Sequence, residues 1–333
     1  MNYKILDKET YKKNNETYYC VLLSFNIKNP YELSFRTIDS FDTIYVIKTT
    51  DRGIGVGEVT ALPGYSEDTI NDLWLIQNNV AKDIHNLNRY ENGFKTVAFR
   101  TCLESYYRGF FNEKKEHCSN YTTIVDKDYD IKANVVKIKI GKNVDNDIDK
   151  IKHAQQYSYK IRVDANQGYS FEEASYFLDN ISDRNMEYVE QLLKKDKWED
   201  MQELRLRYGQ FNFLLDESIF TTEDIDTAMR YKAGTSVKLK LFKHGSIANT
   251  LDVAQYALDN KFQVVLGNGV QTTVGAFHEM YCYNALKKNT NFNKYSEING
   301  PLKISGAIIE HNDCELKINS HDITSLIKEI IDE

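Results

Sequence analysis

The sequence predicts a two-part α/β fold, in which a separate α+β domain precedes a (β/α)8 barrel or a near relative of one. Three observations predict it. Residues 1–115 read as strands followed by helices without alternation; after them, short β-branched strands alternate with amphipathic helices; and a polar residue near the strand ends recurs every 24 to 26 residues. A βα unit needs about that many residues, so the repeat is structural.

Composition argues against several classes of protein, among them nucleic-acid-binding, disulfide-rich and membrane proteins. The chain has 333 residues, a hydrophobic content of 41% and a formal net charge of −7. It contains no basic block or arm, which argues against a nucleic-acid partner. The five cysteines form no CxxC pair, which favours reduced thiols over a disulfide framework or a zinc site. The start lacks the apolar segment of a secretory signal, and no apolar run approaches a membrane span, so we expect a cytoplasmic protein without a membrane partner.

The amino-terminal part combines strand and helix patterns. "YYCVLLSFNI" (18–27) and "TIYVIKTT" (43–50) are rich in β-formers, and "DRGIG" (51–55) supplies a turn after the second of them. Apolar residues then recur at helical spacing over 66–87, and a second helix is predicted over 94–113. These elements predict an α+β domain.

The second part has the number of strands that a (β/α)8 barrel requires. Six strands alternate with helices, and "NYTTIV" before them and "YSEIN" after them bring the total to seven or eight. The segment between the first two strands is too short for a full helix. The predicted strands cover 120–125, 135–140, 159–164, 186–191, 211–218, 235–241, 262–267 and 295–299.

Five polar residues near successive strand ends are the candidate site: Lys139, Asp164, Glu190, Asp216 and Lys240. In such barrels the carboxyl ends of the strands form one mouth, so residues far apart in the sequence converge there. Three carboxylates in one cavity would repel each other unless a cation joins them, and oxygen-only ligands favour Mg²⁺. The sequence therefore predicts a magnesium site at the mouth of the barrel.

A lysine on each side of that ion suggests proton transfer at a carbon between them, next to a substrate carboxylate. Lys137 lies on the same strand face as Lys139, and its charge is expected to favour a neutral Lys139 that can act as a base. Each residue alone also fits a plain structural role, because an Asp often caps the next helix and a Lys-x-Lys pair often lies on a solvated edge. The joint occurrence at matching strand ends favours a site. Lys238, which pairs in the same way with Lys240, has no role that the sequence assigns.

Five motifs carry a resemblance to a known family. They are "KIKIG" (137–141), "RVDANQGY" (162–169), "YVEQ" (188–191), "LDES" (215–218) and "VKLKLFKHGSI" (237–247). Together they resemble the enolase superfamily, specifically its muconate lactonizing enzyme subgroup. The stretch "GIGVGEVTALPGYSEDT" (53–69) also resembles the capping domain of that family.

The resemblance implies an α+β capping domain over 1–115 and a modified TIM-type (β/α)7–8 barrel over 116–304, with 305–333 returning to the capping domain. It implies a metal site for Mg²⁺, with Mn²⁺ as an alternative ion. The implied metal ligands are Asp164, Glu190 and Asp216; the acid/base pair is Lys139 and Lys240; the supporting residues are Lys137, Asn166 and Glu217; and the residues that select the substrate are Arg36, Tyr65, Asn268, Gln271, Glu297 and Asn299.

Three positions depart from the better-known members. Leu192 replaces the proline of a Glu-Gln-Pro motif, and Gln271 stands where a glutamate is common. Dipeptide epimerases carry an Asp-x-Asp-Gly-Pro pattern that binds the ammonium group of the substrate. Here Glu297 keeps an acid and Asn299 loses one, which leaves the substrate open.

The predicted function is an enzyme that removes a proton α to a carboxylate and forms an enediolate. Its predicted substrate is a small carboxylate, and a racemase or epimerase of an N-acyl amino acid or dipeptide is the first hypothesis. An o-succinylbenzoate synthase-type lyase or a muconate-type cycloisomerase is the alternative. A Schiff-base aldolase and a non-catalytic binding protein are remote alternatives. Family members are often oligomeric, so a homo-oligomer is also open.

Overall fold

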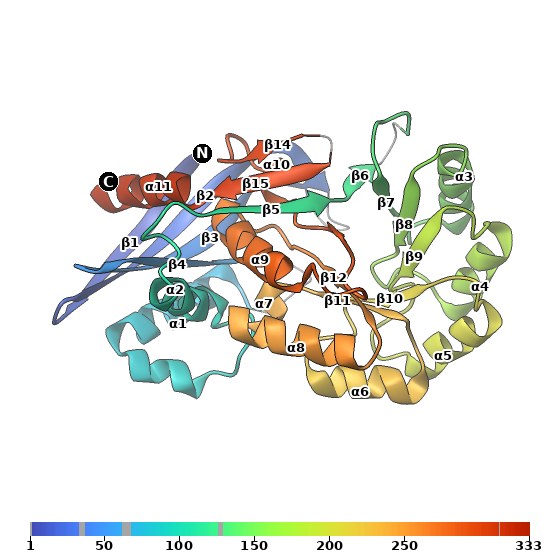
Figure 1. The fold of residues 1–333 in the computed structure, drawn as a ribbon, viewed down its shortest axis with the longest axis horizontal. Coiled ribbons are helices and arrows are strands. Elements are labelled where there is room, and N and C mark those ends of the chain that lie inside the picture. Colours follow the sequence, from blue (N-terminus) through green and yellow to red (C-terminus); the bar gives the residue numbers. More distant parts are fainter. Residues whose placement is uncertain (1, 33–36, 62–67, 126–128, 313) are drawn as a thin grey trace.

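The structure is a computed structural model that describes residues 2–32, 37–61, 68–125, 129–312 and 314–333. It consists of a capping sheet with its helices at one end and a barrel of parallel strands at the other (Figure 1). Among the described residues, no helix is long and apolar enough to cross a membrane.

The amino-terminal part is a four-stranded antiparallel sheet in the order β1-β2-β3-β4, packed against helices. Its elements are β1 (Tyr3–Lys13), β2 (Glu16–Glu32), β3 (Thr37–Thr50), β4 (Gly53–Thr60), α1 (Ile70–Lys82), the 3-10 helix η1 (Ile84–Arg89) and α2 (Val97–Tyr107). The predicted helix over 66–87 begins only at Ile70, because Thr69 caps it: the Thr69 hydroxyl accepts from the N–H of Asp72, and the Asp72 carboxylate accepts from the N–H of Thr69. Helix α2 approaches β4 so closely that a Cβ atom on Gly57 would lie 2.0 Å from the carbonyl oxygen of Ala98. Only glycine fits at that contact.

The second part is a seven-stranded parallel sheet in the order β12-β11-β10-β9-β8-β7-β6, so that spatial order follows chain order. The strands are β6 (Thr123–Val125), β7 (Val135–Lys139), β8 (Lys160–Asp164), β9 (Met186–Glu190), β10 (Phe213–Leu215), β11 (Ser236–Leu239) and β12 (Gln263–Leu266). The helices that follow them are α3 (Val144–Ala154), α4 (Phe171–Asn180), α5 (Trp198–Arg207), α6 (Thr222–Tyr231), α7 (Leu241–His244), α8 (Ile247–Asp259) and α9 (Thr273–Leu286). The predicted alternation is confirmed, and residues 129–134 before β7 contain no helix.

The barrel closes through a short strand at the predicted eighth position. A further sheet has the order β13-β5-β15-β14, with β5 (Glu116–Tyr121), β13 (Tyr295–Ser296), β14 (Glu310–His311) and β15 (Glu315–Asn319). Strand β5 runs directly into β6, and a parallel bridge joins Gly267, after β12, to Glu297, after β13. The segment after β13 contains α10 (Gly300–Lys303). This arrangement confirms a modified barrel of seven to eight strands.

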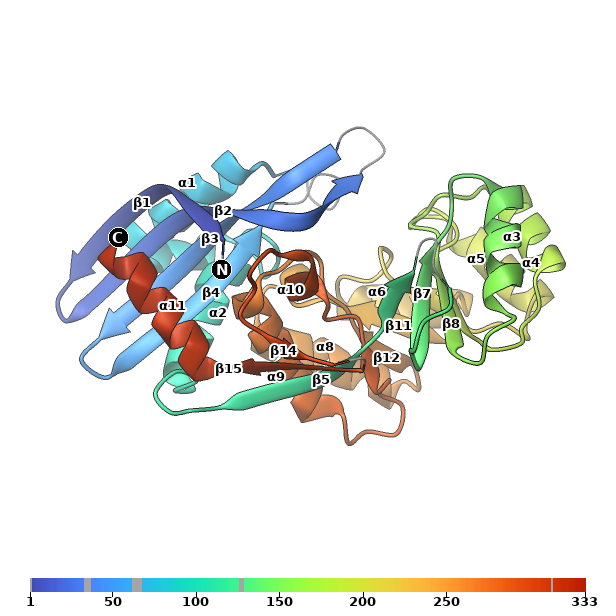
Figure 2. The ribbon, with the colours of Figure 1, turned by 90° about the horizontal axis from the view of Figure 1, so that it is seen from above.

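The carboxyl-terminal helix α11 (Ser320–Asp332) lies beside the capping sheet, and both termini lie near it (Figure 2). The ammonium group of Lys8 in β1 donates to the carbonyls of Ile330 and Ile331 at 3.0 and 2.6 Å. The hydroxyl of Tyr3 donates to Glu329 at 3.0 Å. The end of the chain therefore packs with its beginning, while the domain boundaries at 115 and 304 stay predictions.

Glu58 of β4 connects the capping domain to the barrel. Its buried carboxylate accepts hydrogen bonds from the N–H groups of Thr272 and Gly275 at 2.7 and 2.8 Å, and from the hydroxyl of Thr272. These groups lie at the amino end of α9, where N–H groups lack partners within the helix. Burial raises the pKa of Glu58 to about 7. One carboxylate thus holds the first turn of a barrel helix against the capping sheet.

We expect Glu58 to make stability depend on pH. The folded-state pKa of about 7 lies above the ordinary value of 4.5, so the folded chain holds this proton more tightly than the unfolded chain. Its contribution to the free energy of unfolding is therefore greatest below pH 4.5 and falls as the pH rises to about 7. Relative to Glu58→Gln, the wild type should lose roughly 3 kcal/mol between pH 4 and pH 8, as measured by urea unfolding. The exposed Glu310→Gln is the control, and parallel pH profiles for wild type and Glu58→Gln would contradict this prediction.

Candidate active site

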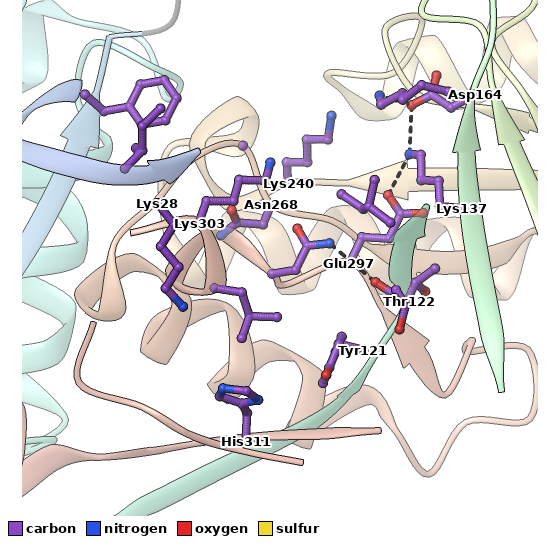
Figure 3. A pocket seen from close by; sticks show the side chains of 18 residues that line it. Lys28, Tyr121, Thr122, Lys137, Asp164, Lys240, Asn268, Glu297, Lys303 and His311 are labelled. Atoms are coloured by element: carbon purple, nitrogen blue, oxygen red, sulfur yellow. Dashed lines mark hydrogen bonds and ion pairs between the residues drawn. The ribbon is translucent and has the colours of Figure 1, made fainter. Parts of the chain in front are cut away.

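A cavity of about 600 Å³ lies between the capping sheet and the carboxyl ends of the parallel strands (Figure 3). Ile27, Lys28 and Phe41 line it from the capping domain. Of the predicted site residues, those that line it are Lys137, Lys139, Asp164, Lys240, Asn268, Glu297 and Asn299. Predicted site residues up to 162 positions apart in the sequence, from Lys137 to Asn299, therefore share one cavity, which is what parallel strand ends predict.

On one side of the cavity, two lysines of β7 share one carboxylate. Asp164, the last residue of β8, receives the ammonium groups of Lys137 and Lys139 on its Oδ2 atom at 2.8 and 2.5 Å. Lys139 also donates to Oδ1 of Asn166 at 2.6 Å. The side chain of Lys137 is 5% exposed and that of Lys139 is 42% exposed, so Lys139 is the more accessible of the two. The predicted common orientation of Lys137 and Lys139 is confirmed.

Lys240 follows directly after β11 and reaches the cavity from a different part of the barrel than Lys139. The strands β8, β9 and β10 lie between β11 and β7. The ammonium group of Lys240 lies 2.6 Å from Oδ2 of Asp216. Lys243, on the turn of α7, pairs with Oδ1 of the same carboxylate at 2.7 Å and donates to the Asp216 carbonyl. Burial alone would raise the pKa of Asp216, but the charges of Lys240 and Lys243 hold it well below its usual range. Lys243 was not predicted; its spacing of three from Lys240 within "KLFK" is the signal that could have indicated it.

Glu190, at the end of β9, lies between Asp164 of β8 and Asp216, which follows β10. Its Oε2 atom contacts the ammonium groups of Lys137, at 2.8 Å, and Lys238. Its buried Oε1 atom has no hydrogen-bond partner among the described residues. Lys238, which the sequence left without a role, is fully buried and bridges Glu190 and Glu297, whose Oε2 atom it approaches to 2.7 Å. It is thus an interior cation of the barrel and does not lie on a solvated face.

Glu297 lines the cavity and belongs to a buried network of charged and polar groups. Its Oε2 atom also receives Lys137 at 2.7 Å, and its Oε1 atom accepts from the hydroxyl of Tyr188 at 2.7 Å. Arg162, which is fully buried, lies 3.6 Å from the same Oε1 atom. Burial opposes ionisation of Glu297, but Lys137, Lys238 and Arg162 outweigh it and keep its pKa well below the usual range. The acid at this position is therefore already neutralised by protein cations.

Of the remaining predicted residues, Asn268 lines the cavity, whereas Glu217 and Gln271 do not. Glu217 accepts from the amide of Asn166 at 3.1 Å, and the supporting role of this pair stays a prediction. Asn268 donates its amide to the buried Glu279, and Gln271 turns back to accept from the N–H of Gly269 at 2.7 Å. Gln271 is buried and does not line the cavity. Arg36 and Tyr65 lie outside the described residues.

At Leu192, which stands in place of the family's proline, the preceding residue Gln191 holds the neighbouring backbone. Gln191 takes a left-handed conformation with φ of 38°, and its side-chain oxygen accepts from the N–H groups of Asp216 and Ser218 at 3.0 and 3.3 Å. Leu192 itself is buried in the core. Gln191 thus fixes the backbone that presents Asp216.

The three strand-end carboxylates are of the chemical type that binds a magnesium ion. Asp164, Glu190 and Asp216 are buried oxygen donors at the ends of three neighbouring strands, and Glu190 keeps one buried oxygen without a partner. In the part of the chain that the structure describes, however, no group of three or more His, Cys, Asp or Glu residues converges to hold an ion. Each of the three carboxylates instead contacts at least one lysine. Their role as metal ligands therefore stays a prediction.

Comparison with known proteins identifies the family. Residues 125–314, more than half of the chain, match the enolase C-terminal domain-like family. The chain belongs to the enolase superfamily. The capping sheet and the modified barrel also have the fold of muconate lactonizing enzyme, the enzyme of the subgroup that the sequence motifs indicated.

The curated relatives are epimerases by name. The chain is 25% identical over 154 residues to the L-amino acid-D/L-Glu epimerase of Sulfurimonas denitrificans, which covers 45% of each protein. It is 21% identical over 287 residues to the D-Ala-D/L-Ala epimerase of Cytophaga hutchinsonii, covering 75% of this chain and 78% of that one. The matched region therefore spans less than half of the first relative.

Solved structures confirm the fold. The dipeptide epimerase of Cytophaga hutchinsonii, complexed with Mg and the dipeptide D-Ala-L-Val, superimposes with a TM-score of 0.75 at 19% identity, over 91% of this chain and 92% of that one. The muconate lactonizing enzyme of Pseudomonas fluorescens, complexed with muconolactone, gives a TM-score of 0.73 at 18% identity, over 93% and 94% of the two chains. Both similarities extend over the capping domain and the barrel of this chain.

Proposed function

We propose that this protein is a magnesium-dependent racemase or epimerase that moves the α-proton of an amino-acid derivative, either an N-acyl amino acid or a dipeptide. One observation carries the proposal: Lys139, at the end of β7, and Lys240, directly after β11, line the same cavity, and three strands lie between β7 and β11. Each ammonium group is held by a different carboxylate, Asp164 or Asp216. A substrate carbon between the two lysines would meet one of them on each face.

The two lysines would act as a relay across the α-carbon. A neutral lysine on one face takes the α-proton, so that the Cα–H bond breaks and an N–H bond forms. The lysine on the other face, in its ammonium form, returns a proton to the carbon and inverts the configuration. Asp164 orients Lys139, Asp216 orients Lys240, and the amide oxygen of Asn166 fixes the position of Lys139.

Asp164, Glu190 and Asp216 are the residues that would hold Mg²⁺. When bound, Mg²⁺ supplies positive charge that stabilises a substrate carboxylate and the enediolate formed from it. The structural relatives that carry Mg together with a dipeptide support this choice of ion. The use of Mn²⁺, a homo-oligomeric state and a cytoplasmic location stay predictions.

Proton exchange in D₂O tests the proposal. With Mg²⁺ and a panel of dipeptides and N-acyl amino acids, we expect loss of the α-proton NMR signal together with inversion at that carbon. EDTA should stop both, and added Mg²⁺ should restore both, because the ion would supply the positive charge that stabilises the enediolate.

Other outcomes would replace the proposal. Loss of a substrate group without inversion would indicate a lyase, and ring closure would indicate a cycloisomerase. Activity that survives EDTA but is lost on treatment with borohydride and substrate would indicate a Schiff-base aldolase. Absence of exchange with every compound of the panel would leave the epimerase proposal without support in its substrate class.

A further inference from the structure

Lys243 is a buried cation that the proposed proton relay does not use. It lies in α7, close after Lys240 in the chain, and its side chain is 1% exposed. Among the described residues, it is not part of the lining of the active-site cavity, so it acts on the site through other residues. A buried ammonium group is stable only where acceptors compensate for the loss of water. Its acceptors therefore indicate what this lysine does.

The acceptors of Lys243 lie on one turn, residues 216–219. Its ammonium group donates to the carbonyl oxygen of Asp216 at 2.5 Å, to the Oδ1 atom of the same residue at 2.7 Å and to the carbonyl oxygen of Ile219 at 3.3 Å. A lysine ammonium has three N–H donors, so these contacts use all of them. One side chain thus ties together both ends of the turn and the carboxylate that the turn carries.

Gln191, directly after β9, holds the same turn from another side. Its Oε1 atom accepts from the N–H groups of Asp216 and Ser218 at 3.0 and 3.3 Å, and its Nε2 atom donates to the hydroxyl of Ser218 at 2.8 Å. The turn is therefore fixed through its N–H groups by Gln191 and through its carbonyl groups by Lys243. Because Gln191 keeps its contacts when Lys243 is replaced, we expect the turn to persist with a less well oriented carboxylate.

Lys243 lines a different cavity from Lys240. This second cavity, of about 490 Å³, lies between residues 91–94, which precede α2, and the barrel, and Phe220 is part of its lining. The ammonium group of Lys243 lies 5.0 Å from the ring centroid of Phe220. The carboxylate of Asp216 is therefore contacted by one lysine from each cavity. A small molecule in the second cavity can approach the position of Lys243 without entering the active site.

We propose that Lys243 is a positioning residue of the magnesium site: it fixes the turn 216–219 so that Asp216 presents its carboxylate to the ion. This inference rests on the proposed function, which makes Asp216 a ligand of Mg²⁺. Lys243 affects the ion in two opposite ways, because its charge repels a dication while its hydrogen bonds orient a ligand. Three contacts on a single turn, one of them to the carboxylate itself, make orientation the larger effect.

Calorimetric titration with Mg²⁺ measures which of the two effects is larger. Lys243→Met keeps most of the side-chain volume and removes the ammonium group, and its dissociation constant for Mg²⁺ should be about 10- to 100-fold higher than that of the wild type. Circular dichroism verifies that the variant is folded. The exposed Lys288→Met is the control and should leave the dissociation constant unchanged. An unchanged or lower dissociation constant for Lys243→Met would overturn the inference, because loss of a repelling charge alone tightens binding.

Chemical rescue separates positioning of Asp216 from a general loss of structure. Lys243→Ala removes the carbon and nitrogen atoms that n-propylammonium contains, and the second cavity gives this small cation a route to their place. Added n-propylammonium should restore most of the Mg²⁺ affinity that Lys243→Ala loses, and it should not change the affinity of the wild type. 1-Propanol, which has a similar shape without the charge, should not restore it. If n-propylammonium has no effect, or 1-propanol has the same effect, the ammonium group of Lys243 does not position Asp216.

The titration and the D₂O experiment together separate this inference from the proposed function. Mg²⁺ binding that depends on Lys243, without α-proton exchange in any substrate, would uphold the positioning role and refute the epimerase. Exchange and inversion by a protein whose Mg²⁺ affinity does not depend on Lys243 would uphold the epimerase and refute the positioning role. A wild type that binds no Mg²⁺ would refute both.

Discussion

Replacing either Lys139 or Lys240 by methionine should reduce epimerisation by about 10²- to 10⁴-fold, because each variant lacks the acid/base group on one face of the α-carbon. Each single variant should still remove the α-proton of the one enantiomer that faces its remaining lysine. In D₂O we therefore expect Lys139→Met and Lys240→Met to exchange the α-proton of opposite enantiomers, without inversion. Proton NMR on each pure enantiomer measures this directly.

The control for this pair is Lys142→Met, an exposed lysine three residues after Lys139. It should retain the activity of the wild type. Circular dichroism should verify folding of Lys240→Met in particular, because Lys240 is buried and its loss leaves Asp216 with Lys243 alone. If both variants exchange the same enantiomer, or both invert configuration at the wild-type rate, the two lysines are not an opposed pair.

Arg162→Met should lower the free energy of unfolding by about 3–5 kcal/mol, the range for breaking a buried ion pair on one side. The guanidinium is fully buried and donates to Glu187 and Thr122 at 2.6 Å, and to Asn293 and the carbonyl of Tyr295 at 3.0 Å. It therefore joins β8 to β9 and to the segment that closes the barrel. Removing it leaves several buried acceptors without a donor.

Urea unfolding of wild type and variant measures this effect. Arg207→Met is the matched control, because Arg207 also pairs with a glutamate but lies on the exposed surface of α5. A surface pair contributes little, so this change should stay within about 0.5–1 kcal/mol. Equal losses for the two variants would show that the Arg162 network contributes no more than a surface ion pair.

The strand ends could be predicted from sequence because they depend on local pattern. The β-branched runs and the amphipathic segments define strands and helices within a few residues, and the interval of 24 to 26 residues requires βα units. Once the strands are parallel, Lys139, Asp164 and Lys240 must reach the same mouth, and all three line the cavity. Connectivity and periodicity alone were sufficient for this part of the site.

The partners of these residues could not be predicted in the same way. Strand alternation places Lys238 on the same side as Lys240, but it does not distinguish the interior of the barrel from its mouth. Only the closed barrel brings Lys238 to Glu190 and Glu297, residues 48 and 59 positions away in the sequence. The Lys-x-Lys pattern in "KLK" resembles a solvated strand edge, but its two lysines have different positions. Lys238 is a buried cation inside the barrel, and Lys240 is an active-site candidate that lines the cavity.

The sequence by itself determined the type of fold, the family and the residues at the strand ends, because each follows from short-range spacing and recognisable motifs. The tertiary structure alone decided which charges meet: that Lys243 shares Asp216 with Lys240, that Glu297 is neutralised by Lys137 and Lys238, and that Lys303 adds positive charge to the cavity. The physical reason is that electrostatic interactions depend on distances in space and on burial, and barrel closure fixes both for residues that the chain keeps far apart.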